Sequence, residues 1–309
     1  MDVKLIFLKF KKVIKQPSLI MLFILNKLSC FFPDKQFLKL KYLLTTGSKL
    51  NLEYPKTFSE KLQWLKLYGH RPEYTMMVDK YAVKDYVSKV IGEKYIIPTL
   101  GVWNSFEEIN FDSLPTRFVL KCTHDSGGLV ICKDKQTFDI KKAQDKIEKS
   151  LKRNYFYVGR EYPYKNVSPR IIAEEYMEDS SYPKKNDDLT DYKFFCFNGY
   201  PVYCQVIRGR NTNETIDFYD MKWNHMPFVG LNPFVGNGLD SVKKPDCLEE
   251  MCEICKRLAL NIPFVRIDFY IINNNIYFGE ITFYPANGFG LFTPKNWNYK
   301  LGELIDLHN

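Results

Sequence analysis

Residues 264–290 read FVRIDFYIINNNIYFGEITFYPANGFG, two β-like runs separated by three asparagines. Asparagine tolerates the left-handed backbone conformation of tight turns, so residues 273–275 predict the turn of an antiparallel hairpin. If this hairpin is centred on Asn274, Asp268 lies directly opposite Glu280. Directly paired residues of an antiparallel sheet have their Cβ atoms about 5 Å apart. The stretch therefore predicts two carboxylates side by side on one face of a sheet.

Two carboxylates at this separation repel each other, so a positive charge should lie between them. Mg²⁺ is one candidate, because it takes one or two carboxylates and completes its shell with water and phosphate oxygens. Arg266 is the other candidate. Side chains alternate along a strand, so Arg266 shares the face of the acids and lies opposite Thr282. The hairpin leaves open whether a metal ion or an arginine network neutralises the pair.

A second stretch, FVLKCTHDSGGLVIC at residues 118–132, carries Lys121 at the end of an apolar run, ahead of a flexible Ser126-Gly127-Gly128 turn. Glycines let the backbone approach a bound group closely, and the lysine offers the positive charge that phosphate oxygens require. The lysine of a P-loop follows the last glycine directly, and here it precedes the glycines. The stretch indicates either a different kind of phosphate grip or an ordinary hairpin.

The chain has 309 residues, of which 45% are hydrophobic and 16% aromatic, so it can form a large core and is not disordered. Helical patterns dominate up to about residue 100, with Thr57 or Ser59 capping one helix and Asp79 another. From Arg117 onward, short β-rich runs alternate with helical stretches. This order predicts an α+β fold with mostly antiparallel hairpins.

The eight cysteines are scattered along the chain and predict reduced thiols in a cytoplasmic protein. Cys252 and Cys255 have the spacing of zinc ligands, but they share one helical face with Leu248, Met251 and Leu258. No second ligand pair follows, so a buried apolar helix face is the better interpretation.

The net charge of +8 is concentrated in residues 1–50, which contain ten lysines and only two acids. This basic N-terminal extension mixes its lysines with Leu, Ile and Phe at helical spacing, but its longest apolar run, 19–25, is too short to span a bilayer. Two interpretations remain open: the segment contacts an anionic membrane surface, or it packs on the protein with its lysines in solvent. Nucleic-acid binding is not expected, because no module with interleaved basic and aromatic residues is present.

Several motifs occur in order along the chain: TFSEKLQWLKLY, DKYAVKDYV, VLKCTHDSGG, DYKFFCFNG, FYD-x-x-WN and VRIDFY followed by GEITFYP. Together they resemble the TupA-like ATP-grasp proteins of bacterial surface-polysaccharide gene clusters. The resemblance extends from about residue 50 to the end of the chain. It implies the ATP-grasp fold, in which two α+β lobes enclose ATP, with the helical basic extension placed before it.

The resemblance also implies a division of the chain and a set of ligand-binding residues. The expected parts are the extension 1–50, an α-rich portion 51–110, a small lobe with the glycine loop 111–178 and a large lobe with the metal site 179–309. The residues expected to bind ATP are Lys80 and Lys121 on the phosphates, Ser126, Gly127 and Gly128 in the mobile loop, and Glu174, Glu175 and Met177 beside adenine. The expected Mg²⁺ ligands are Asp268 and Glu280, with either Thr282 or Asn287 as the third.

Three cations are candidates for the chemistry itself. Arg266 would neutralise the transferred phosphoryl group, because phosphoryl transfer depends mainly on positioning and charge neutralisation. Lys193 and Arg208 would hold the γ-phosphate or the acceptor carboxylate, although each could equally be a structural or solvated cation.

The resemblance implies a cytoplasmic, ATP- and Mg²⁺-dependent carboxylate–amine ligase that works through an acyl phosphate. Its expected substrates are an amine donor, either an amino acid or an amino sugar, and the uronic-acid group of a capsular or cell-wall polysaccharide. The basic extension would bring it to the inner membrane face. The alternative is a glycosyltransferase that uses a nucleotide-sugar and the same acidic pair. The sequence gives no indication of the oligomeric state.

Overall fold

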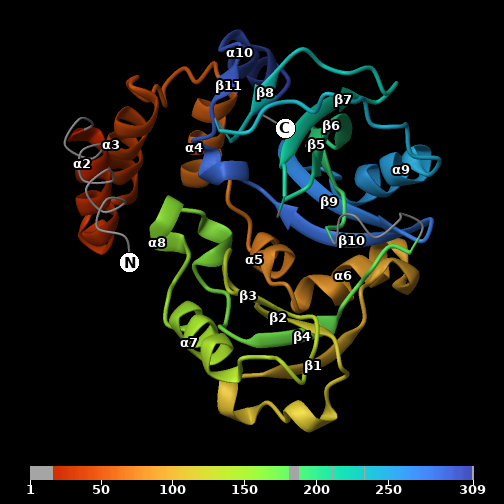
Figure 1. The fold of residues 1–309 in the computed structure, drawn as a ribbon. Helices are drawn as coiled ribbons and strands as arrows, with labels where there is room; N and C mark the ends of the chain where they lie inside the picture. The colour runs from red at the N-terminus through yellow and green to blue at the C-terminus, as the bar shows by residue number, and fades with distance from the viewer. Residues whose placement is uncertain (1–16, 181–187, 211, 233, 308–309) are drawn as a thin grey trace.

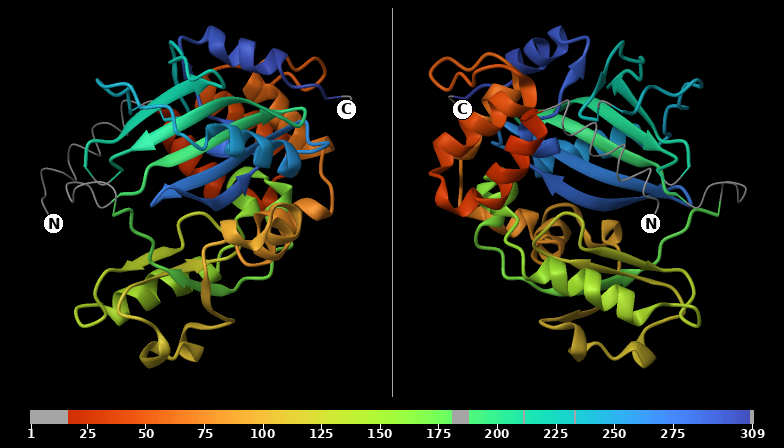
Figure 2. Two further views of the ribbon diagram at one scale, coloured as in Figure 1. Left: turned by 90° about the vertical axis from the view of Figure 1, so that its right-hand side faces the viewer. Right: turned by 60° about the vertical axis from the view of Figure 1, so that its left-hand side comes forward.

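The computed structural model describes residues 17–180, 188–210, 212–232 and 234–307, and these residues form two large antiparallel sheets and a small two-stranded one. The five-stranded sheet of the large lobe lies above the four-stranded sheet of the small lobe in all views (Figures 1 and 2). The expected α+β architecture with two lobes is confirmed. Each lobe has its own buried apolar cluster, so the space between the lobes is free to form a site.

The small-lobe sheet has the strand order β1-β4-β2-β3. Its strands are β1 (Thr99–Trp103), β2 (Phe118–Cys122), β3 (Leu129–Cys132) and β4 (Ile171–Glu175). Alternate residues of β2 are fully buried against α7 (Ile140–Leu151), and Lys121 lies on the opposite face. The strand period therefore directs Lys121 away from the small-lobe core.

The large-lobe sheet has the order β10-β9-β5-β6-β7, in which every pairing is antiparallel. Its strands are β5 (Asp191–Phe197), β6 (Tyr200–Arg208), β7 (Thr215–Asp220), β9 (Phe264–Ile272) and β10 (Asn275–Thr282). Helix α9 (Leu248–Leu258) packs on β5 and β6. It buries Cys255, and the Sγ of Cys252 lies 3.4 Å from the Sδ of Met221.

The remaining elements surround the two sheets. The helices are α2 (Pro17–Lys27), α3 (Asp34–Thr46), α4 (Phe58–Tyr68), α5 (Glu73–Val78), α6 (Ala82–Ile91), α8 (Phe156–Gly159) and α10 (Asn296–Glu303), and β8 (Val229–Gly230) pairs with β11 (Phe292–Thr293). Short 3-10 segments include η1 (Ser29–Phe31), η2 (Glu93–Tyr95), η3 (Phe106–Glu108), η4 (Phe111–Ser113), η5 (Tyr162–Tyr164) and η6 (Pro285–Gly288). In the described part of the chain, no helix is both long and apolar enough to cross a membrane.

Local signals place the helix starts as expected. Thr57 forms a capping box with Glu60 at the start of α4, and the Oδ1 of Asp79 accepts hydrogen bonds from the backbone of Tyr81 and Ala82 before α6. The predicted α-rich portion, 51–110, contains α4, α5 and α6 but also β1, which is an edge strand of the small-lobe sheet. That portion thus contributes to both lobes.

The acidic hairpin has the predicted pairing but not the predicted turn. The turn has two residues, Asn273 and Asn274, both left-handed with φ values of 50° and 64°, rather than three residues centred on Asn274. A bulge between Phe278 and Glu280 then shifts the register by one residue. The two deviations cancel, so Glu280 is paired with Asp268 as predicted.

Candidate functional site

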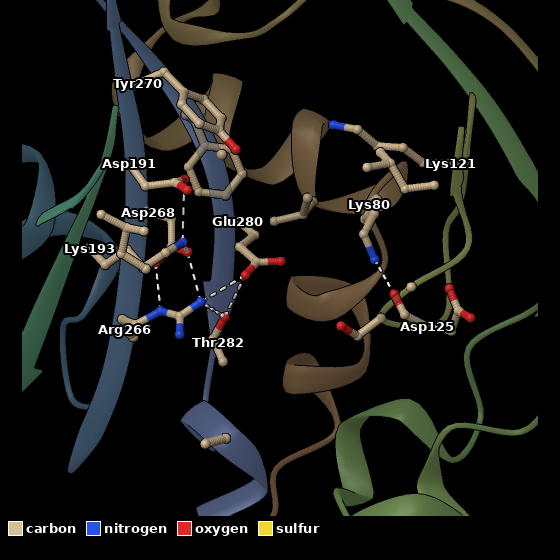
Figure 3. Close-up of a pocket in the computed structure, with 18 of the residues that line it drawn as sticks. Lys80, Lys121, Asp125, Asp191, Lys193, Arg266, Asp268, Tyr270, Glu280 and Thr282 are labelled. Atoms are coloured by element: carbon tan, nitrogen blue, oxygen red, sulfur yellow. Dashed lines mark hydrogen bonds and ion pairs between the residues drawn. The ribbon is translucent and has the colours of Figure 1, made fainter. Parts of the chain in front are cut away.

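A cavity of about 620 Å³ lies between the two lobes and is lined by charged side chains from both of them (Figure 3). The small-lobe side of Figure 3 carries Lys80, Lys121 and Asp125, and the large-lobe side carries the acidic hairpin. Both walls carry cations, Lys80 and Lys121 on one side and Lys193 and Arg266 on the other, and cations from two sides suit a ligand that bears several phosphates.

Three segments of the chain converge on Glu174 in the small lobe. Its Oε1 lies 2.5 Å from the Nζ of Lys84, and its Oε2 forms an ion pair with the Nζ of Lys121. Burial of Glu174 by itself would raise the pKa of the carboxyl, but the two lysines outweigh this and hold the pKa below its usual value. Glu174 therefore serves as an anionic anchor that fixes two lysines at the cavity wall.

Lys80 lies between α5 and α6, directly after the capping residue Asp79. Its Nζ donates a hydrogen bond to the backbone carbonyl of Asp125, and its own backbone N–H donates to Thr123 over 3.1 Å. Burial lowers the pKa of Lys80. The cation is thereby held against the start of the glycine loop (Figure 3).

The glycine loop, residues 125–128, is anchored by its buried aspartate. The carboxylate of Asp125 accepts hydrogen bonds from Ser150 and, at 2.9 Å, from Arg153. Gly127 has a φ of 111°, which side chains rarely adopt, and a Cβ on Gly128 would come within 2.5 Å of the Ser150 Oγ. The loop backbone therefore requires both glycines.

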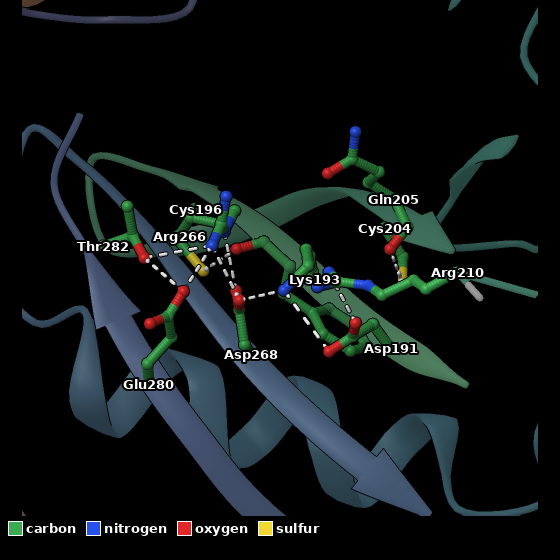
Figure 4. A network of polar contacts seen from close by, with 11 residues as sticks. Asp191, Lys193, Cys196, Cys204, Gln205, Arg210, Arg266, Asp268, Glu280 and Thr282 are labelled. Atoms are coloured by element: carbon green, nitrogen blue, oxygen red, sulfur yellow. Dashed lines mark hydrogen bonds and ion pairs between the residues drawn. The ribbon is translucent and has the colours of Figure 1, made fainter. Parts of the chain in front are cut away.

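On the large-lobe side, Arg266 binds the acidic pair (Figure 4). Its Nε and Nη2 donate to the two carboxylate oxygens of Asp268, each over 2.7 Å, and Nη2 also donates to the Oε1 of Glu280 over 2.8 Å. Lys193 forms a further ion pair with Asp268, and the hydroxyl of Thr282 lies 3.1 Å from Arg266 Nη2. The structure thus contains the arginine network that the sequence allowed.

The electrostatics of Glu280 differ from those of Asp268. The Asp268 side chain is almost fully buried, whereas 42% of the Glu280 side chain is exposed. Burial would raise the pKa of Glu280, but the nearby charges of Arg266, Lys193 and Lys80 outweigh it and lower the pKa to about 2. Glu280 is therefore ionised and accessible from the cavity.

Comparison with known proteins assigns the chain to a family. The family model described as TupA-like ATPgrasp matches residues 60–306. The chain belongs to the TupA-like ATP-grasp family. It is therefore an ATP-grasp ligase, an enzyme that binds ATP and joins a carboxylate to an amine. The earlier resemblance is thus confirmed.

Solved structures similar to this TupA-like ATP-grasp ligase include other ligases. D-alanine–D-alanine ligase from Helicobacter pylori is 14% identical, with 81% of this chain and 67% of that chain covered and a TM-score of 0.44. D-alanine–D-alanine ligase from Bacillus anthracis is 16% identical, with 80% of this chain and 67% of that chain covered and a TM-score of 0.40. A RimK domain protein from Sphaerobacter thermophilus DSM 20745 is 9% identical, with 75% of this chain and 69% of that chain covered and a TM-score of 0.40. At such identities and TM-scores these likenesses support no statement about substrate. No curated protein gives a significant match.

The acidic hairpin of the ATP-grasp ligase has donors that suit Mg²⁺. Mg²⁺ uses one or two carboxylates and takes its other ligands from water and phosphate. Glu280 is the carboxylate open to the cavity, and Asp268 is opposite it, although both Asp268 oxygens are bound by Arg266 and Lys193. Within the described residues, no group of three or more acidic, His or Cys side chains could hold a metal ion. A Mg²⁺ ion here would thus depend on the phosphates that it accompanies, and it would neutralise their charge.

Not all of the predicted site residues of the ATP-grasp ligase reach the cavity. Those that line it are Lys80, Lys121, Ser126, Gly127, Gly128, Glu174, Lys193, Arg266, Asp268, Glu280, Thr282 and Asn287. Glu175, Met177 and Arg208 are not among its lining residues. Glu175 alternates with Glu174 along β4 and is exposed on the other face. Arg208 points toward β7, where it pairs with Asp217 at 3.2 Å.

Other cavity residues were missed by the sequence reasoning. Lys84 follows Lys80 by four residues, about one helical turn. Asp191 lies two residues before Lys193 and therefore on the same face of β5. Spacing alone could have suggested both Lys84 and Asp191. Arg210 lies just beyond β6 and pairs with Asp191 at 2.6 Å. Glu161 lies in an irregular segment, and no local pattern marks it.

Proposed function

We propose that this TupA-like ATP-grasp ligase uses Mg-ATP to activate the carboxylate of a uronic acid in a surface polysaccharide, which then captures an amine. The observation that carries the ATP-dependent chemistry is the convergence of lysines and arginines from both lobes on one cavity that also contains Glu280. The polysaccharide substrate is supported by the sequence motifs shared with proteins of polysaccharide gene clusters.

The proposed reaction has two steps. A carboxylate oxygen attacks the γ-phosphorus of ATP, the bond to the bridging oxygen of ADP breaks, and an acyl phosphate forms. The amine nitrogen then attacks the acyl carbon, the carbon–oxygen bond to phosphate breaks, and an amide forms. Lys80, Lys121 and Lys84 hold negative phosphate groups in this scheme, while Arg266 neutralises charge that develops on the transferred group. The glycine loop shields the hydrolysable intermediate from water.

Heat protection by Mg-ATP tests this proposal. At 100 times its Kd, a ligand that binds only the folded state stabilises it by about 2.7 kcal/mol, so the Tm should rise clearly. Lys121→Met should weaken ATP binding at least tenfold and reduce this rise, because Glu174 would retain only Lys84 and the phosphates would lose a cation. Differential scanning fluorimetry over an ATP titration measures both effects.

The matched control is Lys89→Met, which removes a lysine from the outer face of α6, where it pairs only with exposed Asp85. Its response to Mg-ATP should equal that of the wild type. Protection by UDP-glucuronate without protection by Mg-ATP would contradict the ligase proposal and favour the glycosyltransferase alternative.

We further propose that α2 and η1 bind an anionic membrane surface. These segments expose large apolar side chains to solvent, with 63% of Phe23 and 79% of Phe31 exposed. The others are Leu19, Ile20, Met21 and Ile24 in α2, and Leu28 between the two segments. The exposed Lys27, Lys35 and Lys39 lie close by in sequence, and α2 lies at the outer edge of the molecule (Figure 1). Apolar side chains beside lysines suit the headgroup region of anionic lipid.

Vesicle co-sedimentation tests the membrane proposal. The wild type should bind vesicles containing 30% phosphatidylglycerol, bind neutral phosphatidylcholine vesicles more weakly, and lose binding when Phe23 and Phe31 are both replaced by glutamate. Tyr200→Glu, at a 64%-exposed position on β6, is the control and should bind like the wild type. Undiminished sedimentation of the double variant would contradict the proposal, because it would show that the exposed apolar side chains Phe23 and Phe31 do not contribute to vesicle binding.

A further inference from the structure

Glu161 is a buried carboxylate that the ATP-binding residues do not use. It lies between α8 and η5, only 3% of its surface is exposed, and it lines the cavity. Among the described residues, its side chain has no hydrogen bond or ion pair. Acidic side chains are almost never fully buried without a partner, so this carboxylate calls for a cationic ligand.

Lys66 is the lysine that interacts most strongly with the charge of Glu161, but its hydrogen-bond donors are all used by other groups. The three protons of the Lys66 Nζ go to the side-chain oxygen of Gln63 at 3.0 Å and to the carbonyls of Gly159 and Asn287 at 2.7 and 2.6 Å. These bonds hold the turn at Gly159, two residues before Glu161, close to the turn at Asn287. Lys66 thus positions Glu161 without neutralising it through a direct contact.

The surroundings of Glu161 favour an organic ammonium group. Tyr155, Tyr164 and Tyr284 line the same cavity, and the rings of Tyr155 and Tyr164 meet edge to face with centroids 4.9 Å apart. Tyrosine faces attract cations. Another acceptor that lines the cavity, the buried Oδ1 of Asn287, has no hydrogen-bond partner in the described part of the chain. This end of the cavity therefore offers acceptors and aromatic faces.

We propose that Glu161, with Tyr155 and Tyr164, forms the subsite for the amine substrate. A primary ammonium group binds at the Glu161 carboxylate and transfers one proton to it. The resulting neutral nitrogen attacks the acyl carbon, the bond from that carbon to the phosphate oxygen breaks, and the second proton leaves with the phosphate. This inference rests on the ligase function proposed above and adds the position and the chemistry of the amine.

The electrostatics of the site agree with this role. Glu161 interacts electrostatically with Glu280 and Arg266, which places it toward the acidic hairpin. Burial raises the pKa of Glu161 to about 7, although Lys66, Arg266 and Lys41 oppose the change. A base with a pKa near 7 is best suited to accept a proton at neutral pH.

Titration with two matched small molecules tests the subsite. The protein is saturated with Mg-AMP-PNP, and its Tm is measured against glycinamide, a primary ammonium, and against acetamide, which lacks the charge. Glycinamide should raise the Tm of the wild type, and acetamide should not. Glu161→Gln should weaken glycinamide binding at least tenfold while retaining the response to Mg-AMP-PNP. Glu253→Gln, on the exposed face of α9, should behave like the wild type.

The outcomes separate the two proposals. Equal responses of the wild type and Glu161→Gln to glycinamide, or equal responses of the wild type to glycinamide and acetamide, would overturn the amine subsite. Absence of any response to Mg-AMP-PNP would instead overturn the ATP-binding assignment. Glu161→Ala provides a second variant: it should also lose the glycinamide response, so a retained response would again contradict the proposal.

Discussion

Replacing Asp268 with asparagine should lower the rate of ADP release from Mg-ATP by about a thousandfold, a loss typical of removing a key charge from a preorganised site. Asp268 holds Arg266 through two hydrogen bonds of 2.7 Å and also pairs with Lys193. A neutral amide cannot balance two buried cations, so neither would stay aimed at the phosphates. If Asp268 also binds Mg²⁺, the same change removes a metal ligand.

The same variant should lose about 3 kcal/mol of unfolding free energy, because removing one partner of a buried ion pair leaves uncompensated charge. Urea unfolding at pH 7 measures this loss. Asp85→Asn removes an exposed ion pair on α6 and is the control, with an expected change within about 0.5 kcal/mol. Undiminished ADP release by Asp268→Asn would show that the acidic hairpin is not the site of phosphoryl transfer.

Glu161→Gln should stabilise the protein, and increasingly so as the pH rises. The folded-state pKa of Glu161 is raised from 4.5 to about 7, chiefly by burial, so the unfolded chain loses this proton at a lower pH than the folded chain. Between these two values the unfolded state binds fewer protons, and wild-type stability falls with rising pH. Above pH 7 the accumulated cost is about 3 kcal/mol, which glutamine avoids.

The measurement is urea unfolding of both proteins at pH 4.5 and pH 8. The two should have nearly equal stability at pH 4.5, and the variant should exceed the wild type at pH 8. Other groups facing Glu161 also titrate, including Lys66, whose pKa burial lowers to about 7. The comparison therefore uses the difference in unfolding free energy between the two proteins at each pH, because Lys66 is present and titrates in both proteins. A constant difference at the two pH values would contradict a buried, unpaired carboxylate at residue 161.

The acidic hairpin illustrates how far sequence periodicity reaches. Alternation along the strand placed Arg266 and Asp268 on one face, and the predicted pairing with Glu280 was confirmed. The predicted turn was wrong, because Asn273 and Asn274 form a two-residue turn and a bulge at Gly279 compensates. A bulge depends on close packing between strands: a Cβ on Gly279 would lie 3.1 Å from the Asp268 carbonyl. The alternation of polar and apolar residues along a strand does not predict such contacts between strands.

The arginines near the end of β6 show where periodicity fails. Arg208 and Arg210 are two residues apart, and the sequence favoured Arg208 for the site. In the fold, Arg208 pairs with Asp217 on β7, and Arg210 lies beyond the strand end and pairs with Asp191 in the cavity. The choice depends on which neighbouring strand supplies an acid, and a single sequence does not contain that information.

The sequence by itself determined the family, the hairpin with its paired acids, the helix caps at Thr57 and Asp79, and the glycine loop. These features are local, since each depends on residues a few positions apart or on strands joined by a tight turn. The tertiary structure alone decided that Lys84 and Lys121 meet on Glu174, and that Glu161 is buried at the cavity with no ion pair to any other described residue. Those features join segments tens of residues apart, and only the packing of the two lobes brings their charges together.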